Sequence, residues 1–346
     1  MAIDWTRGYS AEWRVHRVNE ATWADAERLE GVDEVDVDLV ATGQLAGGGM
    51  TVTAPLGTEF EPGYYRVGMV ARQDGASERV DLATLLFESA EWEDARGVRT
   101  FECEGRSVLH PAAKLRELPY PYAPAGTDGA EMAAALLRAN MAAPVVVEGS
   151  FALGADVAFA PGKDALTCAW LMLDAGGFMM FLDGDGTVRI APRPTEPALD
   201  LAQVGARLIM PGTSHELDMT EIPNRYTAVM GDQRAQAVNE DESSPTSRQA
   251  RGYWHDVYDS APKPLDGETL ERYCERKLRE ASTVSGAGAS YEREWWPGAV
   301  PGCIVRGGLA STGIEGDLRI VSQALTCANG VTVAEKACRE VVTWRG

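Results

Sequence analysis

Residues 224–308 contain a strand, a long polar connection, one isolated helix and further strands. The first strand is NRYTAVMGD (Asn224–Asp232), and QAVNEDESSPTSRQARG (236–252) forms most of the connection. The stretch continues with WHDVYDSAPKPL (254–265), DGETLERYCERKLREAS (266–282) and YEREWWPGAVPGCIVRGG (291–308). Aromatic and β-branched residues bounded by glycine and proline predict strands on both sides of the helix. We therefore expect a β-rich region with one inserted helix, and a long exposed loop over the polar residues 231–252.

The inserted helix is predicted near residues 266–282. Asp266 fits an N-cap and Glu268 the first turn, while Lys277 and Arg279 lie toward the C-terminal end, as the helix dipole favours. One stripe carries the residues expected to pack on a sheet, which are Leu270, Tyr273, Cys274, the aliphatic stem of Lys277, and Leu278.

The first hundred residues also have the composition of strands. In EVDVDLV (34–40), Val35 and Val37 alternate with Asp36 and Asp38. Because successive side chains of a strand point to opposite faces, this pattern predicts a half-buried strand with one wet, acidic face. Several such strands at short spacing indicate a barrel or a sandwich.

The region between about residues 111 and 221 mixes helices and strands. AEMAAALLRANMAA (130–143) is rich in helix formers and follows Asp128, a possible cap. DALTCAWLMLDAGG (164–177) predicts a second helix that begins near Pro161 and ends at Gly176. Its expected buried stripe consists of Ala165, Cys168, Ala169, Met172 and Leu173.

FMMFLDGDGTVRIAPRP (178–194) predicts a tight hairpin, since Asp-Gly residues separate two apolar runs. Asp183, Asp185 and Gly186 also imitate the start of a calcium loop. An EF-hand needs a glutamate at its twelfth position, however, and Pro194 stands there. The hairpin is therefore the preferred interpretation.

The charge of the chain is its strongest compositional signal. Its 346 residues include 52 acids and 32 bases, which gives a formal net charge of −20. Stable nucleic-acid binding needs clustered lysine and arginine, so this composition disfavours it. Charge alone leaves two interpretations open: an ordinary acidic surface, or a surface that DNA passes without sticking. We find no spanning apolar segment and no signal peptide, so we expect no membrane insertion and synthesis in the cytoplasm.

No pattern typical of a catalytic, cofactor or metal site is found. Ser214 and His215 are adjacent in GTSHE, and in an extended segment they would point to opposite faces rather than form a dyad. No H-x-x-x-H, H-E-x-x-H or C-x-x-C motif occurs, although distant histidines could still converge in space. The scattered candidates are His16, His110, His215, His255, Cys103, Cys168, Cys274, Cys303, Cys327 and Cys338. We predict that the cysteines are buried free thiols.

YEREWWPG (291–298) is an aromatic group with two interpretations. It could bind a sugar or a partner protein through its tryptophans. The preferred interpretation is a strand in which Trp295 packs in the core and Trp296 covers an edge or an interface, with Pro297 marking the strand end.

The order of these segments resembles the phage tail hub family, the baseplate or tail-tip hubs. The resemblance rests on GVRTFECEGRSVLHPAAKL (97–115), the helix and hairpin of DALTCAWLMLDAGGFMMFLDGDGTVRI (164–190), NRYTAVMG (224–231), PGAVPGCIVRG (297–307) and DLRIVSQALTC (317–327). It covers nearly the whole chain. Each motif is weak by itself, and their order and spacing carry the resemblance.

The resemblance implies an α+β, mainly β protein with two tube-like β-barrels. Residues 1–110 would form the first barrel and 111–221 an intervening α/β region. Residues 222–346 would form the second barrel, with the helix near 266–282 packed on it. Many hubs continue into a lytic or receptor-binding region, but this chain ends at Gly346, so such functions are expected in another protein.

The resemblance also implies a function without catalysis. The chain would be a structural hub of a virion tail, assembled in the host cytoplasm as a homotrimeric ring between the tail tube and the tip. Expected partners are the tail tube or distal tail protein, a tip, spike or fibre protein, and the tape-measure protein, with DNA passing through the lumen without specific binding. Two alternatives remain: a tail-associated enzyme that cleaves carbohydrate or peptidoglycan with paired carboxylates, and a monomeric binding module that uses Trp295 and Trp296.

Overall fold

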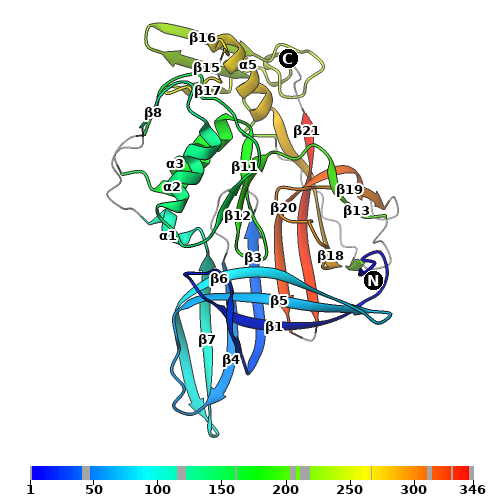
Figure 1. Cartoon of the computed structure of the whole chain (residues 1–346). Helices are drawn as coiled ribbons and strands as arrows, with labels where there is room; N and C mark the ends of the chain where they lie inside the picture. The colour runs from blue at the N-terminus through cyan, green and yellow to red at the C-terminus, as the bar shows by residue number, and fades with distance from the viewer. Residues whose placement is uncertain are drawn as a thin grey trace.

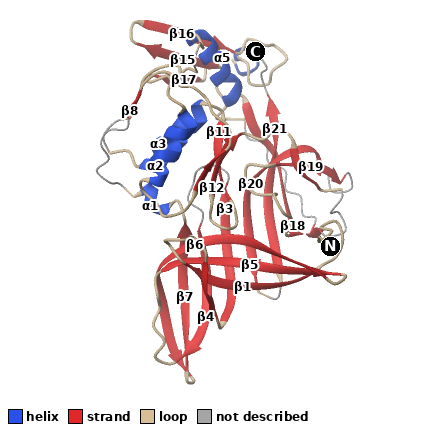
Figure 2. Ribbon diagram, viewed as in Figure 1, coloured by secondary structure: helices blue, strands red, loops and turns tan. Residues whose placement is uncertain are grey.

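The computed structural model is dominated by strands, with a few helices gathered beside and above a long sheet (Figures 1 and 2). The prediction of an α+β, mainly β protein is confirmed. The structure describes residues 2–40, 47–114, 122–159, 162–202, 208–210, 219–265, 267–309, 314–328 and 330–342. No described helix is long and apolar enough to cross a bilayer.

The first part of the long sheet is built from seven strands around one apolar core. These strands are β1 (Ser10–Val18), β2 (Asp25–Leu29), β3 (Val32–Val40), β4 (Gly47–Pro55), β5 (Gly63–Gln73), β6 (Ala76–Ala95) and β7 (Val98–Ser107). Val35, Val37 and Leu39 of β3 are buried in this core, whereas Asp36 and Asp38 are exposed. The predicted alternation is thus confirmed.

The sheet does not stop at β3, because the C-terminal strands continue it. β3 pairs with β20 antiparallel, so that Val37 lies opposite Leu325. In Figure 1 the blue β3 stands beside the orange and red strands from the other end of the chain. The added strands are β13 (Pro197–Asp200), β14 (Leu208–Met210), β18 (Thr283–Glu294), β19 (Ile304–Leu309), β20 (Ile314–Cys327) and β21 (Val331–Val342). The two halves of the chain therefore share one hydrogen-bonded sheet.

The middle of the chain packs helices on a small three-stranded sheet. Asp128 caps α2 (Gly129–Arg138) by accepting from the N–H groups of Ala130 and Glu131. α3 (Ala165–Ala175) ends at Gly176 as predicted, and its predicted stripe is buried. The helix begins at Ala165 after the N-cap Asp164, which is later than the start predicted near Pro161; Pro161 itself lies outside the described residues. The other elements are α1 (His110–Ala113), β8 (Tyr122–Ala123), β9 (Val145–Val147), β10 (Val157–Ala158), β11 (Phe178–Leu182) and β12 (Val188–Pro192).

The Asp-Gly turn is a hairpin, as predicted, and it joins this middle region to the first core. The indole Nε1 of Trp23 donates to the Asp185 carbonyl at 2.8 Å, and the Thr84 hydroxyl donates to the Gly184 carbonyl at 3.0 Å. The buried guanidinium of Arg66 also donates to Asp185 O, at 2.8 Å. These bonds hold the turn against β6 and its neighbours, so the residues that imitate a calcium loop serve as a docking turn.

A separate small sheet carries the inserted helix. β15 (Arg225–Met230) lies between β16 (Gln233–Val238) and β17 (Asp256–Asp259), and α5 (Leu270–Ala281) packs on it. Leu270, Tyr273, Cys274 and Leu278 are buried as expected. The predicted start of the helix is wrong, because Thr269 is the N-cap and Glu271 is the acid of the first turn. Asp266 itself lies outside the described residues.

The polar stretch after Gly231 is not the long exposed loop that we expected. It contains β16 and the short helix α4 (Arg248–Arg251). Asn239 and Thr246 are fully buried, and Asn239 Nδ2 donates to Ser244 Oγ at 2.9 Å and to Thr246 Oγ1 at 3.3 Å. Polar side chains tolerate burial when they satisfy one another in this way. The polar composition of this stretch therefore did not predict how much of it is exposed to solvent.

The boundaries predicted at 110/111 and 221/222 stay predictions. The buried residues fall into several apolar clusters, one under the first seven strands, two around the middle helices, one under the C-terminal strands and one under α5. Residues 222–346 thus contribute to two different sheets, which meet along the chain where α5 leads into β18 (Figure 1).

Candidate functional site: the acidic face of the long sheet

The solvent-exposed face of the long sheet gathers carboxylates from strands far apart in sequence. Asp36 of β3 lies opposite Gly49 of β4, which lies opposite Glu104 of β7. Because side chains opposite one another share a face, the acids of these strands line up across the sheet. This surface, called the acidic face below, carries Glu34, Asp36, Asp38, Glu91, Glu102, Glu104 and Glu292.

Small and uncharged residues separate the carboxylates of the acidic face. Gly47 and Ala324 lie on either side of Asp38, and Thr326 lies opposite Asp36 and donates to its Oδ1 at 2.7 Å. Among the described side chains, the bases that the same register places on this face are Arg106, Arg319 and Lys336. The face therefore carries a clear excess of negative charge, and its small residues leave that charge open to solvent.

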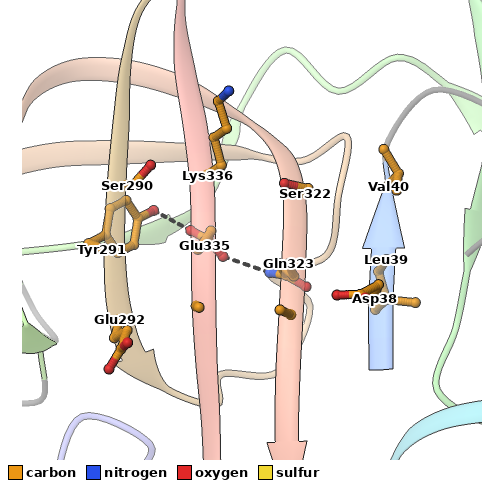
Figure 3. A pocket seen from close by; sticks show the side chains of 12 residues that line it. Asp38, Leu39, Val40, Ser290, Tyr291, Glu292, Ser322, Gln323, Glu335 and Lys336 are labelled. Atoms are coloured by element: carbon orange, nitrogen blue, oxygen red, sulfur yellow. Dashed lines mark hydrogen bonds between the residues drawn. The ribbon is translucent and has the colours of Figure 1, made fainter. Parts of the chain in front are cut away.

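A shallow hollow of about 570 Å³ lies on the C-terminal part of this face. Figure 3 shows Ser290, Glu292 and Lys336 beside it, with Asp38 on the neighbouring β3. Its walls come from β3, β18, β20 and β21, which belong to both halves of the chain. The hollow is thus a feature of the shared sheet rather than of either half.

A buried ion pair lies beneath this hollow. The Arg293 guanidinium donates to Glu335 Oε2 from Nε at 3.1 Å and from Nη2 at 2.6 Å, and the two side chains are 2% and 0% exposed. Gln323 Nε2 donates to the same oxygen at 2.6 Å, and the Tyr291 hydroxyl donates to Oε1 (Figure 3). Burial raises the pKa of Tyr291 well above its ordinary value, so the hydroxyl stays protonated as a donor.

This cluster fixes the strands that carry the acidic face. Arg293 and Gln323 both donate to the Ala299 carbonyl, at 3.3 and 2.6 Å, so β18, β20, β21 and the loop after β18 are tied together. A buried charge network is stable when every member is paired, and this one is. The cluster therefore supports from beneath the part of the acidic face that β18, β20 and β21 carry.

Comparisons with known proteins point to one class of fold. No protein-family model and no curated protein sequence matches the chain. A tail protein from Neisseria meningitidis MC58 matches with a TM-score of 0.67 at 13% identity, over 96% of this chain and 98% of that chain. The chain has the fold of phage tail proteins.

Two further structures support this tail-protein fold. The 43 kDa tail protein of prophage MuSo2 from Shewanella oneidensis gives a TM-score of 0.62 at 12% identity, over 96% of this chain and 98% of that one. A prophage tail protein from Listeria monocytogenes EGD-e gives 0.54 at 12% identity, over 95% and 94%. The tail-protein fold implied by the order of the sequence motifs is confirmed over almost the whole chain.

Within the tail-protein fold, the scattered histidines lie on separate elements. His16 Nδ1 is 3.9 Å from an Asp25 oxygen, and His110 Nε2 is 3.8 Å from a Glu88 oxygen. His255 precedes β17, while Ser214 and His215 lie outside the described residues. Among the described residues, no group of three His, Cys, Asp or Glu side chains could hold a metal ion.

The cysteines and the tryptophan pair mainly serve packing in this tail-protein fold. Five cysteines are buried free thiols, and the side chain of Cys338 lies outside the described residues. Trp295 packs on the first core with its ring centroid 5.4 Å from that of Trp5, and Trp296 packs on the C-terminal core. The packing interpretation of Trp295 is confirmed. The sequence patterns drew attention to these aromatic residues. Of the carboxylates on the acidic face, the sequence patterns indicated only Asp36 and Asp38 of β3.

Proposed function

We propose that this chain is a structural hub of a phage, prophage or phage-derived tail. It would assemble as a homotrimeric ring that joins the tail tube to the tip and lines the channel. The observation that carries the proposal is the acidic face, which runs across both halves of the chain on one shared sheet. The tail-protein fold supports it. The proposal assigns the chain no reaction, cofactor or metal.

The shared sheet supports the proposed ring. β3 and β20 join the N-terminal and C-terminal strands of one subunit edge to edge, and with two proposed tube-like parts in each subunit, three subunits would supply six such parts. Six parts match a sixfold tail tube. β14 ends the main path of the sheet at its C-terminal side, with no further strand paired beyond it among the described residues, so a strand edge remains there for contacts between subunits.

The charge of the acidic face supports the proposed channel. A polyanion that passes an acidic wall is repelled rather than bound, which keeps friction low. In this arrangement the acidic face would line the lumen, and DNA and the tape-measure protein would move past it. The tail tube or distal tail protein would bind one rim of the ring and a tip, spike or fibre protein the other. The ring would form in the host cytoplasm and function in the virion tail.

The mass of the purified protein in solution tests the ring. A trimer of the 37.2 kDa chain has a mass of about 112 kDa. We expect light scattering to give this mass and negative-stain images of the same peak to show rings with a central hole. A monomer that neither concentration nor a purified tail-tube protein converts to rings would contradict the proposal.

A charge-reversed acidic face is expected to bind DNA. In the variant Glu34→Lys/Asp38→Lys/Glu104→Lys, three exposed acids become bases on one surface, so phosphate contacts become favourable. We expect this variant to retard duplex DNA in a gel at low salt and to lose the effect at high salt, while the wild-type protein leaves DNA unshifted. The matched control reverses Glu59, Glu78 and Glu240, away from this face. Equal retardation by both variants would show that DNA binding depends on the total charge of the protein and not on charge reversal at the acidic face.

A further inference from the structure

A second hollow opens at one end of the first core, away from the acidic face. It encloses about 340 Å³ and is called the end hollow here. Its floor is apolar and comes from Met50, Val52, Tyr65, Phe101 and Cys103, each no more than 5% exposed. Concave sites with apolar floors and a few polar groups are the usual form of binding sites. The volume exceeds the roughly 150 Å³ of an apolar cavity that holds benzene in another protein, so a large side chain fits.

A free strand edge borders the end hollow. β2 pairs with β1 on one side, and no described strand pairs with its other side. Glu27, Arg28 and Leu29 of β2 line the hollow. The backbone N–H and C=O groups of an edge strand can pair with an incoming strand, and a pocket for alternate side chains then gives specificity. The edge and the hollow are therefore suited to one extended ligand.

The rim of the end hollow has unpaired negative charge. Arg17 pairs with Glu61, and Arg28 Nε lies 3.2 Å from Glu30 Oε1. Glu27 and Glu59 also line the rim; neither forms an ion pair among the described residues, and Arg99, the base near Glu59, is bonded to Asp94. A ligand with basic residues beside its apolar anchor would complement these carboxylates, and the contribution of the charges would fall with added salt.

We propose that the end hollow and the β2 edge form a docking site for an extended segment of a different protein. The segment adds a strand to β2, inserts one large apolar side chain into the hollow, and places lysine or arginine next to Glu27 and Glu59. A different protein is the favoured occupant because this chain is itself acidic, with a formal net charge of −20, so a second copy would bring like charge to the acidic rim. The proposal goes beyond ring formation and does not depend on it.

Titration calorimetry with short synthetic peptides tests the site. The probe has valines alternating around a central tryptophan and a lysine at each end, and the comparison peptide has alanine at the centre. We expect the tryptophan peptide to bind the full-length protein at least tenfold more tightly than the alanine peptide. Glu27→Lys should weaken binding by tenfold or more, and Glu59→Lys, on a different element, should act in the same direction.

The control variant is Glu34→Lys, which changes an exposed acid of β3 that does not line the end hollow. Circular dichroism of each variant establishes that it is folded, and light scattering records its oligomeric state. Equal binding of the two peptides, or equal weakening by Glu34→Lys and Glu27→Lys, would overturn the proposal. So would self-association that Glu27→Lys abolishes, because it would assign the hollow to a second copy. A protein that is not a trimer but still binds the tryptophan peptide would contradict the proposed ring and leave the docking site supported.

Discussion

Replacing Glu335 by alanine is expected to lower the free energy of unfolding by about 3–5 kcal/mol. The substitution leaves the guanidinium of Arg293, 2% exposed, without its carboxylate partner, and removes the acceptor of Tyr291 and Gln323. Breaking a buried pair costs far more than the pair contributes over an apolar replacement, because the remaining charge stays desolvated. Urea denaturation followed by circular dichroism measures the change.

Two controls separate this burial effect from a general loss of charge. Glu292→Ala removes a less buried neighbour on the same strand as Arg293 and should change the stability by less than about 1 kcal/mol. The double variant Arg293→Met/Glu335→Leu should be more stable than Glu335→Ala, since no unpaired charge remains. If Glu335→Ala lowered the free energy of unfolding by less than about 1 kcal/mol, the cluster would not hold β18, β20 and β21 together.

The second large effect is expected at Gly184, in the docking turn of the β11–β12 hairpin. A Cβ built there would lie 1.9 Å from the Asp81 carbonyl oxygen and 2.4 Å from its carbon. Both atoms belong to the backbone of β6, so they cannot move aside as a flexible side chain could. We expect Gly184→Ala to cost about 3 kcal/mol and to loosen the contact between the hairpin and the first core. Thermal unfolding and hydrogen exchange of the β11–β12 segment measure the two effects.

Gly8→Ala is the matched control, because no heavy atom beyond the adjoining residues lies within 4 Å of the position of its Cβ. It should change the stability by no more than about 0.5 kcal/mol. If Gly184→Ala unfolded at the same temperature as the wild-type protein, the turn would not be held against β6 as closely as the structure shows.

Local patterns predicted the individual elements well. The alternation of apolar and acidic residues around Val35 and Asp36 predicts a strand whichever strands pair with it. Asp128 caps a helix that begins at the next residue, so this signal is also local. The start of α5 was wrong because Asp266 and Thr269 are both good caps, and the sequence alone gives no means to choose. Thr269 is the cap in the structure, where its hydroxyl accepts from the Arg272 N–H.

Non-local relations could not be obtained from the sequence. The acidic face depends on the register of β3 against β20 and β4, which no motif encodes. With 52 acids and 32 bases in the chain, nothing marks Glu335 as the partner of Arg293. The burial of Asn239 likewise depends on hydroxyls five and seven positions away that turn toward it. Each of these features depends on which residues pair in space, whereas local sequence patterns mainly indicate the tendency of a segment to form a helix or a strand.

The pairing of β3 with β20 also constrains synthesis. Asp36 and Thr326 are bonded across 290 positions, so β3 leaves the ribosome long before its second neighbour exists. Until then one edge of the first seven strands stays open, and open edges of nascent sheets promote misassembly with other chains. Contacts between such distant positions also make folding slow. A nascent chain of this protein should therefore depend on holding chaperones until its last strands emerge, and truncation before β20 should yield aggregates rather than a folded N-terminal fragment.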